Sequence, residues 1–519
     1  MTAAALPASS RSPLPGGLSA ITVTVGVLTV AAIAVLTTLT LTDGPAELRA
    51  IAQLVLMAAF AALALLDFRA AVALALVELA LGGASGAWTR LPGGWSGRQG
   101  LDLIVMLAAL RILYQDWRRT GDLRLGRYAP HALILAATIP LIWMPLGLLN
   151  GHDPRDVFSD GNGHLFFAFT LVFVALINRG QAGWLRGCFL AVCAANAVFT
   201  LVLIAITAPG WVPLHAVLRP LLLADLDMGG AVGYMSNGAF RLYLGSGIYL
   251  QVGLALTAWG LLQQPRRWWL WALYAVLIID VIATYTRGFW LGTALAIGLV
   301  LILASRDWRR PLMLVVATLA LLTVLTGAGR LVGFSLPDYV LSRSASLFEQ
   351  PDETPRASGT ASARPRPSAP PEGSREGGGA TTDEGGAYSN LVRATQAQVL
   401  MGHIAERPIL GHGFGAIARD YPYAQIFSYE LAFLDLAYKT GIVGTLLYVS
   451  YPLRLLLDAM RGRFRRLRVA PGVPPRELAV VVAILVSVLA VGATNPYILA
   501  AFGLLPILVC VAWLQPADG

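Results

Sequence analysis

Three ionisable residues that lie far apart in the sequence could share one substrate: Arg241, Arg287 and Glu430. Arginine suits a diphosphate because its planar guanidinium forms paired, charge-assisted hydrogen bonds and stays charged. A carboxylate at the edge of apolar surroundings tends to have a raised pKa, which suits a general base. These residue types therefore fit a lipid-linked pyrophosphate and an attacking hydroxyl. A plainer interpretation stays open, in which the arginines reach toward lipid headgroups and the glutamate caps a helix.

The composition indicates what positions these residues. The chain has 519 residues, of which 56% are hydrophobic and 13% charged, whereas soluble domains are about a quarter charged. The apolar blocks, of about 17–24 residues, are long enough to cross a bilayer, so we predict an all-α, polytopic bundle of about 14 spans. The predicted spans are Leu18–Leu41, Leu48–Leu66, Ala70–Trp88, Leu101–Trp117, Ala129–Leu149, His164–Asn178, Trp184–Thr207, Ser246–Gln263, Trp268–Tyr285, Phe289–Ser305, Pro311–Gly327, Leu431–Leu457, Leu478–Thr494 and Ile498–Leu514.

Three regions follow from this layout: residues 1–327 with the earlier spans, an outer loop over residues 328–430, and residues 431–519 with the last spans. Within the loop, residues 350–388 contain no large aliphatic side chain, which predicts disorder. Residues 390–407 carry Leu400, Met401 and Ile404 at helical spacing. We therefore predict an amphipathic helix on the outer membrane surface.

The placement of arginine predicts the orientation of the chain. Short loops on one side are rich in arginine, as in residues 118–127 and 306–310, and such loops are typically cytoplasmic. Both termini would then be cytoplasmic, and the three candidate residues would share the outer boundary. This topology accounts for the net charge of +9 without nucleic acid. The expected location is a bacterial cytoplasmic membrane, with the site facing the periplasm and with membrane lipids as partners.

No metal-ligand spacing is evident. The three cysteines lie within apolar blocks, which argues against a disulfide framework or a zinc site. The outer residues Asp153, Asp156 and Asp160 have Asp-Pro and Asp-Gly neighbours, which favour turns over a metal site. We expect neither a metal nor a cofactor.

Four sequence elements surround the candidate residues. In chain order they are GAFRLYLGSGIYLQVGLAL (238–256), TYTRGFWLG (284–292), RATQAQVLMGHIAERPILGHGFG (393–415) and SYELAFLDLAYKTGIVG (428–444). With the long outer loop before the last span of the set, this order resembles the O-antigen ligase and polymerase family of bacterial envelope glycosyltransferases. The resemblance covers residues 236–457.

The family motifs match this chain residue by residue, with one departure. An arginine opening a span matches Arg241, a Thr-Arg-Gly element contains Arg287, and an Arg-Pro-x-x-Gly-x-Gly element begins at Arg407. Ligases of the family usually show His-Asn with a glycine eleven residues after the histidine. Counting back from Gly441 reaches Glu430, followed by leucine in place of asparagine. This departure favours a polymerase over a ligase.

The resemblance implies transfer of a glycan from an undecaprenyl-diphosphate-linked donor to a hydroxyl of a glycan or lipid acceptor, without nucleotide sugar or metal. Glu430 would deprotonate the acceptor hydroxyl, and Arg241 and Arg287 would hold the diphosphate. Arg393 could contact the carrier phosphate as well. His403 or His412 could assist in place of the missing histidine.

Two other classes of protein stay open. A lipid-glycan flippase or other multispanning transporter would also bind an anionic substrate with arginines, although transporters commonly show internal repeats and midplane sites. A non-catalytic scaffold would not need arginines and a carboxylate at one membrane level. The sequence leaves the oligomeric state open.

Overall fold

The computed structural model describes residues 20–41, 45–81, 97–207, 231–234, 240–305, 307–331, 382–422, 429–464 and 477–515. Within these ranges the regular secondary structure is helical apart from one pair of short strands, so the all-α class is confirmed. Three predicted features lie partly outside the described residues: the start of the first span, the end of the third, and residues 350–381 of the segment for which disorder was predicted.

The described residues up to Thr207 form a series of mostly apolar helices. Asp153 caps α6, where its carboxylate accepts the backbone N–H of Arg155 at 2.7 Å, so the turn chemistry predicted there is confirmed for this residue. The elements are α1 (Ala20–Leu41), α2 (Ala46–Leu66), α3 (Phe68–Leu81), α4 (Gly97–Thr120), α5 (Ala129–Leu149), α6 (Pro154–Leu165), η3 (Phe166–Phe169), α7 (Thr170–Ile177) and α8 (Ala182–Thr207).

The second part contains a β-hairpin that was not predicted. Strand β1 (Ala231–Tyr234) pairs antiparallel with β2 (Phe240–Tyr243), with Gly233 opposite Arg241. The elements that follow are η4 (Gly245–Gly247), α10 (Ile248–Gln263), α11 (Trp268–Ala283), α12 (Arg287–Ala304), α13 (Arg309–Leu331), α15 (Thr382–Glu406), α16 (Ala432–Phe464), α17 (Glu477–Gly492), η5 (Pro496–Leu499), α18 (Ala501–Val509) and α19 (Val511–Leu514).

Eight of the described helical segments are long and apolar enough to cross a membrane. Four further apolar helices have 10–17 residues, among them α11 and α17, and so fall short of the roughly 20 residues that an upright span needs. A multispanning helical protein is therefore supported, whereas the predicted number of 14 spans is not established.

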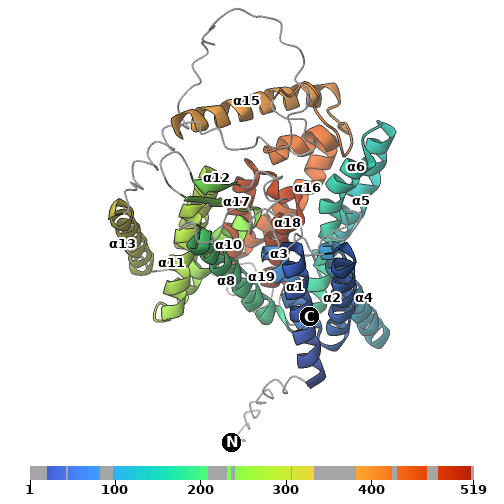
Figure 1. Ribbon diagram of the computed structural model, residues 1–519, viewed down its shortest axis with the longest axis horizontal. Helices are drawn as coiled ribbons and strands as arrows, with labels where there is room; N and C mark the ends of the chain where they lie inside the picture. The colour runs from blue at the N-terminus through green and yellow to red at the C-terminus, as the bar shows by residue number, and fades with distance from the viewer. Residues whose placement is uncertain are drawn as a thin grey trace, which may run out of the picture.

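Helices α17, α18 and α19 form the centre of the bundle (Figure 1). Every residue of α18 and α19 is buried, and α17 packs against α10, α12 and α16. A helix that is apolar all round needs such enclosure or a lipid surface. Helix α13 instead suits a lipid surface, because it lies at the edge of the bundle and only 6% of its apolar stretch is buried in the protein.

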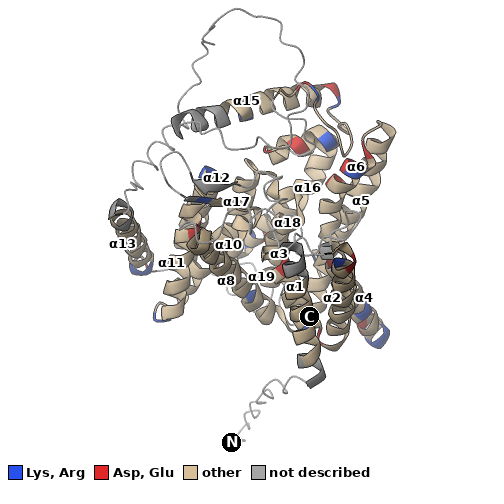
Figure 2. Cartoon of the chain, in the orientation of Figure 1, with Lys and Arg blue, Asp and Glu red and all other residues tan. Residues whose placement is uncertain are grey.

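Charged residues gather at the two ends of the bundle (Figure 2). Basic residues colour the lower ends of α4, α11 and α13, and α4 carries Arg118 and Arg119 in its last turn. At the opposite end, α15 lies across the bundle above α16, α17 and α18, and charge also gathers at the starts of α12 and α16. The end with α15 is therefore where the candidate residues can meet.

Helix α16 is interrupted near its start, and a glycine-rich loop forms hydrogen bonds with the backbone groups that the interruption leaves without helical partners. Gly441 has φ 62° and ψ −170°, which interrupts the helix. The N–H groups of Ile442 and Val443 donate to the carbonyls of Pro408 and Ile409, at 2.8 and 3.3 Å. Buried backbone groups need such partners in apolar surroundings. We call residues 408–415 the glycine loop.

The backbones of the glycine loop and α16 touch so closely that side chains cannot fit between them. A Cβ on Gly411 would lie 2.5 Å from the nitrogen of Gly441, and one on Gly441 would lie 2.2 Å from the carbonyl oxygen of Ile409. Gly413 likewise has a positive φ of 86° and meets Gly147 of α5. The Arg-Pro-x-x-Gly-x-Gly element thus has a steric reason: its glycines allow the loop to lie between α5 and α16.

We expect Gly441→Ala to destabilise the protein, because alanine at this φ and ψ is strained by about 1–3 kcal/mol and its Cβ collides with backbone. Thermal unfolding of the protein in detergent, followed by tryptophan fluorescence, should show a lower Tm. Gly402→Ala is the matched control, because Gly402 is helical and exposed, and a methyl group there would meet no other atom within 4 Å. Equal Tm values for the two variants would contradict the packing argument.

Candidate active site

Arg241 lies on β2 and reaches the turn before α12. Its Nε donates to the carbonyl of Thr284 at 3.2 Å, and one terminal nitrogen lies 3.4 Å from the hydroxyl of Thr286. Its guanidinium also lies over the ring of Tyr243, 5.3 Å from the ring centre. The structure thus brings Arg241 to the Thr-Arg-Gly element that contains Arg287.

The turn that presents Arg287 is strained. Among the described residues, Tyr285 is the non-glycine residue with a positive φ, at 48°, a conformation that costs of order 1–3 kcal/mol and often accompanies functional sites. Thr286 then takes the N-cap position and Arg287 starts α12. The partial positive charge of a helix N-terminus adds to that of the guanidinium, which favours a bound anion. Arg287 donates to Asn390 of α15 at 2.9 Å.

Helix α15 supplies the other half of the site from one face. Arg393, one turn after Asn390, donates through Nε to Glu430 at 2.7 Å. One turn further on, the side-chain oxygen of Gln396 accepts the backbone N–H of Leu431 at 3.1 Å. Residues three apart share a helix face, so α15 holds both the candidate base and the arginine of α12. The side chain of Glu430 is 44% exposed.

Three residues with polar groups at the site were not predicted. The hydroxyl of Tyr243 donates to the side-chain oxygen of Asn495 at 2.8 Å and is also hydrogen-bonded to Tyr497. Burial raises the pKa of Tyr243, and the guanidinium of Arg241 lies over its ring. Tyr243 stood within the matched motif, but Asn495 and Tyr497 lie about 250 residues further along the chain and gave no local signal.

His403 and His412 lie elsewhere. His403 follows Arg393 by ten residues on α15, or about 15 Å along the helix axis. It is hydrogen-bonded to Asp420 at 2.7 Å and to Glu406 at 3.2 Å. Partial burial lowers the pKa of His403, but these two carboxylates outweigh it and raise the pKa overall. Burial lowers the pKa of His412. The structure does not bring these histidines to Glu430.

Below the site, the lysine of the chain joins two buried carboxylates. The ammonium of Lys439 lies 2.9 Å from Asp160 and 3.0 Å from Asp435. Asp160 also accepts the N–H of Gly415 at 2.7 Å, and Asp435 accepts that of Tyr429 at 3.4 Å. This ionic cluster therefore ties α6, the glycine loop and the residue before the candidate base to α16. The turn interpretation of Asp160 missed this contact.

Helix α15 differs from its predicted placement on the membrane surface. Leu400 is fully buried and packs with Tyr429 and Tyr438, whereas Met401 is 55% exposed. The helix also begins at Thr382, inside the segment for which disorder was predicted. Its inner face packs on protein rather than on lipid, because α16 and the glycine loop lie beneath it.

We expect Lys439→Met to lower stability by about 3–5 kcal/mol, because it leaves two buried carboxylates without their cation. Thermal unfolding in detergent measures this loss. Arg461→Met removes an exposed partner of Asp458 and should cost under about 1 kcal/mol. Adding Asp160→Asn and Asp435→Asn to Lys439→Met should restore part of the Tm. A Tm of the single variant equal to that of the wild type would show that the ionic cluster does not stabilise the fold.

Comparison with known families supports the resemblance found in the motifs. Residues 272–449 match the family model described as O-antigen ligase. The matched segment contains Arg287, Arg393 and Glu430 together with both histidines, whereas Arg241 lies before it. A search of curated proteins found no match for this chain. Over this segment, about a third of its length, the chain is therefore similar to the O-antigen ligase family, and its apolar helices are consistent with a membrane protein of that kind.

Proposed function

We propose that this protein transfers a glycan from an undecaprenyl-diphosphate-linked donor to an acceptor hydroxyl at the outer face of the cytoplasmic membrane. The observation that carries the proposal is the ion pair between Arg393 and Glu430, at 2.7 Å, beneath α15. Arg287 joins the same face of α15 through Asn390, and Arg241 reaches the turn before α12. Cations and a carboxylate above apolar helices suit a carrier whose headgroup is a diphosphate and whose tail is a hydrocarbon.

In the transfer step, the acceptor oxygen attacks the anomeric carbon of the donor sugar. Glu430 accepts the hydroxyl proton as the new glycosidic bond forms. The bond between the anomeric carbon and the phosphate oxygen breaks, and undecaprenyl diphosphate leaves with its negative charge. Arg241 and Arg287 stabilise that charge by paired hydrogen bonds in a site of low dielectric constant. Arg393 orients Glu430; a direct contact with the carrier phosphate would require this ion pair to open.

Within this class we favour a polymerase, because Glu430 and Leu431 replace the His-Asn pair that ligases of the family usually carry. A flippase is the second candidate, since it too would bind a lipid-linked diphosphate. Incubating the purified protein with a synthetic diphosphate-linked oligosaccharide separates the candidates. Longer chains on the carrier indicate a polymerase, transfer to an added acceptor alone indicates a ligase, and movement across vesicles without transfer indicates a flippase.

We expect Glu430→Gln to lower transfer by at least about 100-fold, the usual contribution of a general base, while donor binding changes little. Glutamine keeps the size and one hydrogen-bonding oxygen but cannot accept the proton. Transfer is measured by product chain length, and binding by thermophoresis with a fluorescent donor. Glu47→Gln, an exposed change on α2, should leave both unchanged. Full transfer by the Glu430 variant would exclude a role as base.

We expect Arg287→Lys to reduce kcat/KM by about tenfold or more, because lysine keeps the charge but loses the planar fork that binds phosphate oxygens in pairs. The control is Arg267→Lys, an exposed change before α11 at the other end of the bundle. Steady-state kinetics with the synthetic donor measures both variants. Equal losses in the two variants would mean that the effect does not arise at the diphosphate.

A further inference from the structure

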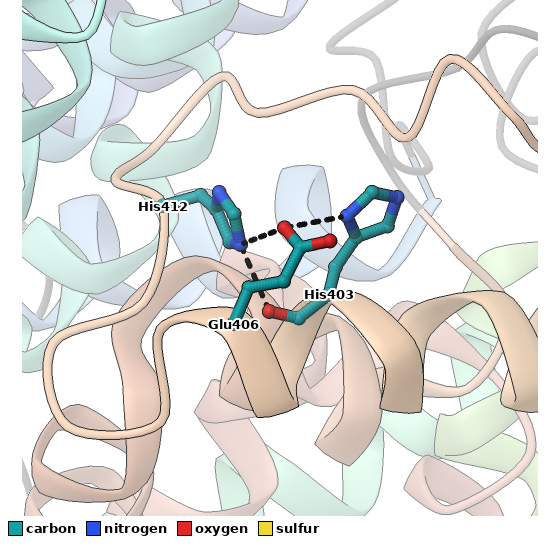
Figure 3. Close-up of side chains that lie close together, drawn as sticks. All are labelled: His403, Glu406 and His412. Carbon is teal, nitrogen blue, oxygen red and sulfur yellow. Dashed lines mark hydrogen bonds and ion pairs between the residues drawn. The ribbon is translucent and has the colours of Figure 1, made fainter.

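His403, Glu406 and His412 form a second cluster at the far end of α15 (Figure 3). His403 and Glu406 lie three residues apart on the helix and face the same side, and His412 reaches them from the glycine loop. One potential ligand atom from each residue lies within 4.8 Å of the other two. Two imidazoles and a carboxylate are a donor set that zinc commonly uses.

The separations fit a small tetrahedral ion. The Nδ1 atom of His403 lies 3.2 Å from Oε2 of Glu406, and Nε2 of His412 lies 3.9 Å from the same oxygen. Zinc bonds of about 2.0–2.2 Å would separate tetrahedral ligands by about 3.4 Å. The side chain of Glu406 is 60% exposed, so its carboxylate can adjust to an ion, and the ligand nitrogens of His403 and His412 lie within 4.8 Å of each other.

The surroundings of His403 point independently to a cation. Its Nε2 lies 2.7 Å from Asp420, and when a neutral imidazole donates there, Nδ1 presents a lone pair toward the carboxylate of Glu406. Two acceptors facing each other need a proton or a metal ion between them. A carboxylate on the outer ring nitrogen is also the usual arrangement behind a histidine that ligates zinc.

The histidine rings are held by packing. The centre of the His403 ring lies 5.6 Å, and that of His412 4.9 Å, from the centre of the Tyr438 ring on α16. The backbone N–H of His412 donates to the carbonyl of Tyr438 at 3.0 Å. The Nε2 atom of His412 lies 3.0 Å from the carbonyl of His403, a hydrogen bond that it would exchange for the metal by changing tautomer.

We propose that His403, Glu406 and His412 bind one divalent transition-metal ion, best fitted by Zn²⁺, with water in the fourth position. The ion clamps the end of α15 to the glycine loop and thereby to the break in α16. Its role is structural, because about 15 Å of helix separates His403 from Arg393. The site revises the expectation of no metal, and it does not depend on the proposed glycosyl transfer.

The test uses the full-length protein without a histidine tag, stripped with EDTA in detergent and dialysed against ZnCl₂. Mass spectrometry of the metal should find about one zinc per chain, and added zinc should raise the Tm, because an ion that binds only the folded state stabilises it. Glu406→Gln and His412→Gln should each weaken zinc binding at least about tenfold. Asp420→Asn should weaken it by about 10–100-fold, as expected of a carboxylate behind a ligand.

Glu47→Gln, the matched control, should bind zinc like the wild type. Co²⁺ offers a second measurement, because its visible absorption bands should appear with the wild type and vanish with His412→Gln even where that variant has a lower Tm. The proposal would be overturned if all variants retained zinc equally. It would also be overturned if the wild type held no more zinc than the buffer and its Tm did not change. The latter result would leave a proton between His403 and Glu406.

Discussion

The structure around the candidate site depends on one constraint: a helix broken in apolar surroundings must find other partners for its backbone groups. Gly441 interrupts α16, and the glycine loop supplies both donors and acceptors to the exposed ends. Gly413 donates to the carbonyl of Lys439 at 2.8 Å, while Pro408 accepts from Ile442. Because the loop continues directly from α15, the repair of α16 also fixes where α15 lies. Helix α15, whose Arg393 binds Glu430, is thus positioned by the backbone hydrogen bonds of the glycine loop rather than by the charges of the site.

The second requirement is electrostatic, and it explains why lysine appears where arginine prevails elsewhere. Lys439 is 3% exposed and lies between Asp160 and Asp435, where a compact ammonium can serve two carboxylates from different helices. Buried charge of one sign alone would be expensive, whereas a satisfied cluster fixes geometry. Arginine serves at the exposed end instead, where a planar fork suits diphosphate oxygens. Lysine therefore supports the fold below the candidate site, and arginine is the residue type that the proposed diphosphate substrate would require above it.

The sequence was most informative where the signal is local. The spacing of Glu430 and Gly441 identified Glu430 by its place in the family motif, and the structure gives Gly441 a physical role through the close backbone contact of Gly411 with Gly441. Span counting placed Arg241 and Arg287 at one membrane boundary, and in the structure Arg241 contacts Thr286, the residue before Arg287. What the sequence could not give were contacts between distant segments. Asn495 joins Tyr243 from about 250 residues away, and Asp160 joins Lys439 across 279. The sequence also did not show which side of α15 is buried. Leu400 and Met401 are both apolar and at helical spacing, but contact with α16 buries Leu400 and leaves Met401 exposed.

Helix α15 connects the site to the histidine cluster because a helix transmits direction as well as distance. Ten residues at about 100° each turn the side chain of His403 about 80° away from that of Arg393. Arg393 can therefore point to Glu430 while His403 points to Asp420 and the glycine loop. A loop in this place could supply the same residue types but would not keep the two directions related. A clamp at the histidine end restricts rotation of α15 about its axis, which is the motion that would most readily separate Arg393 from Glu430.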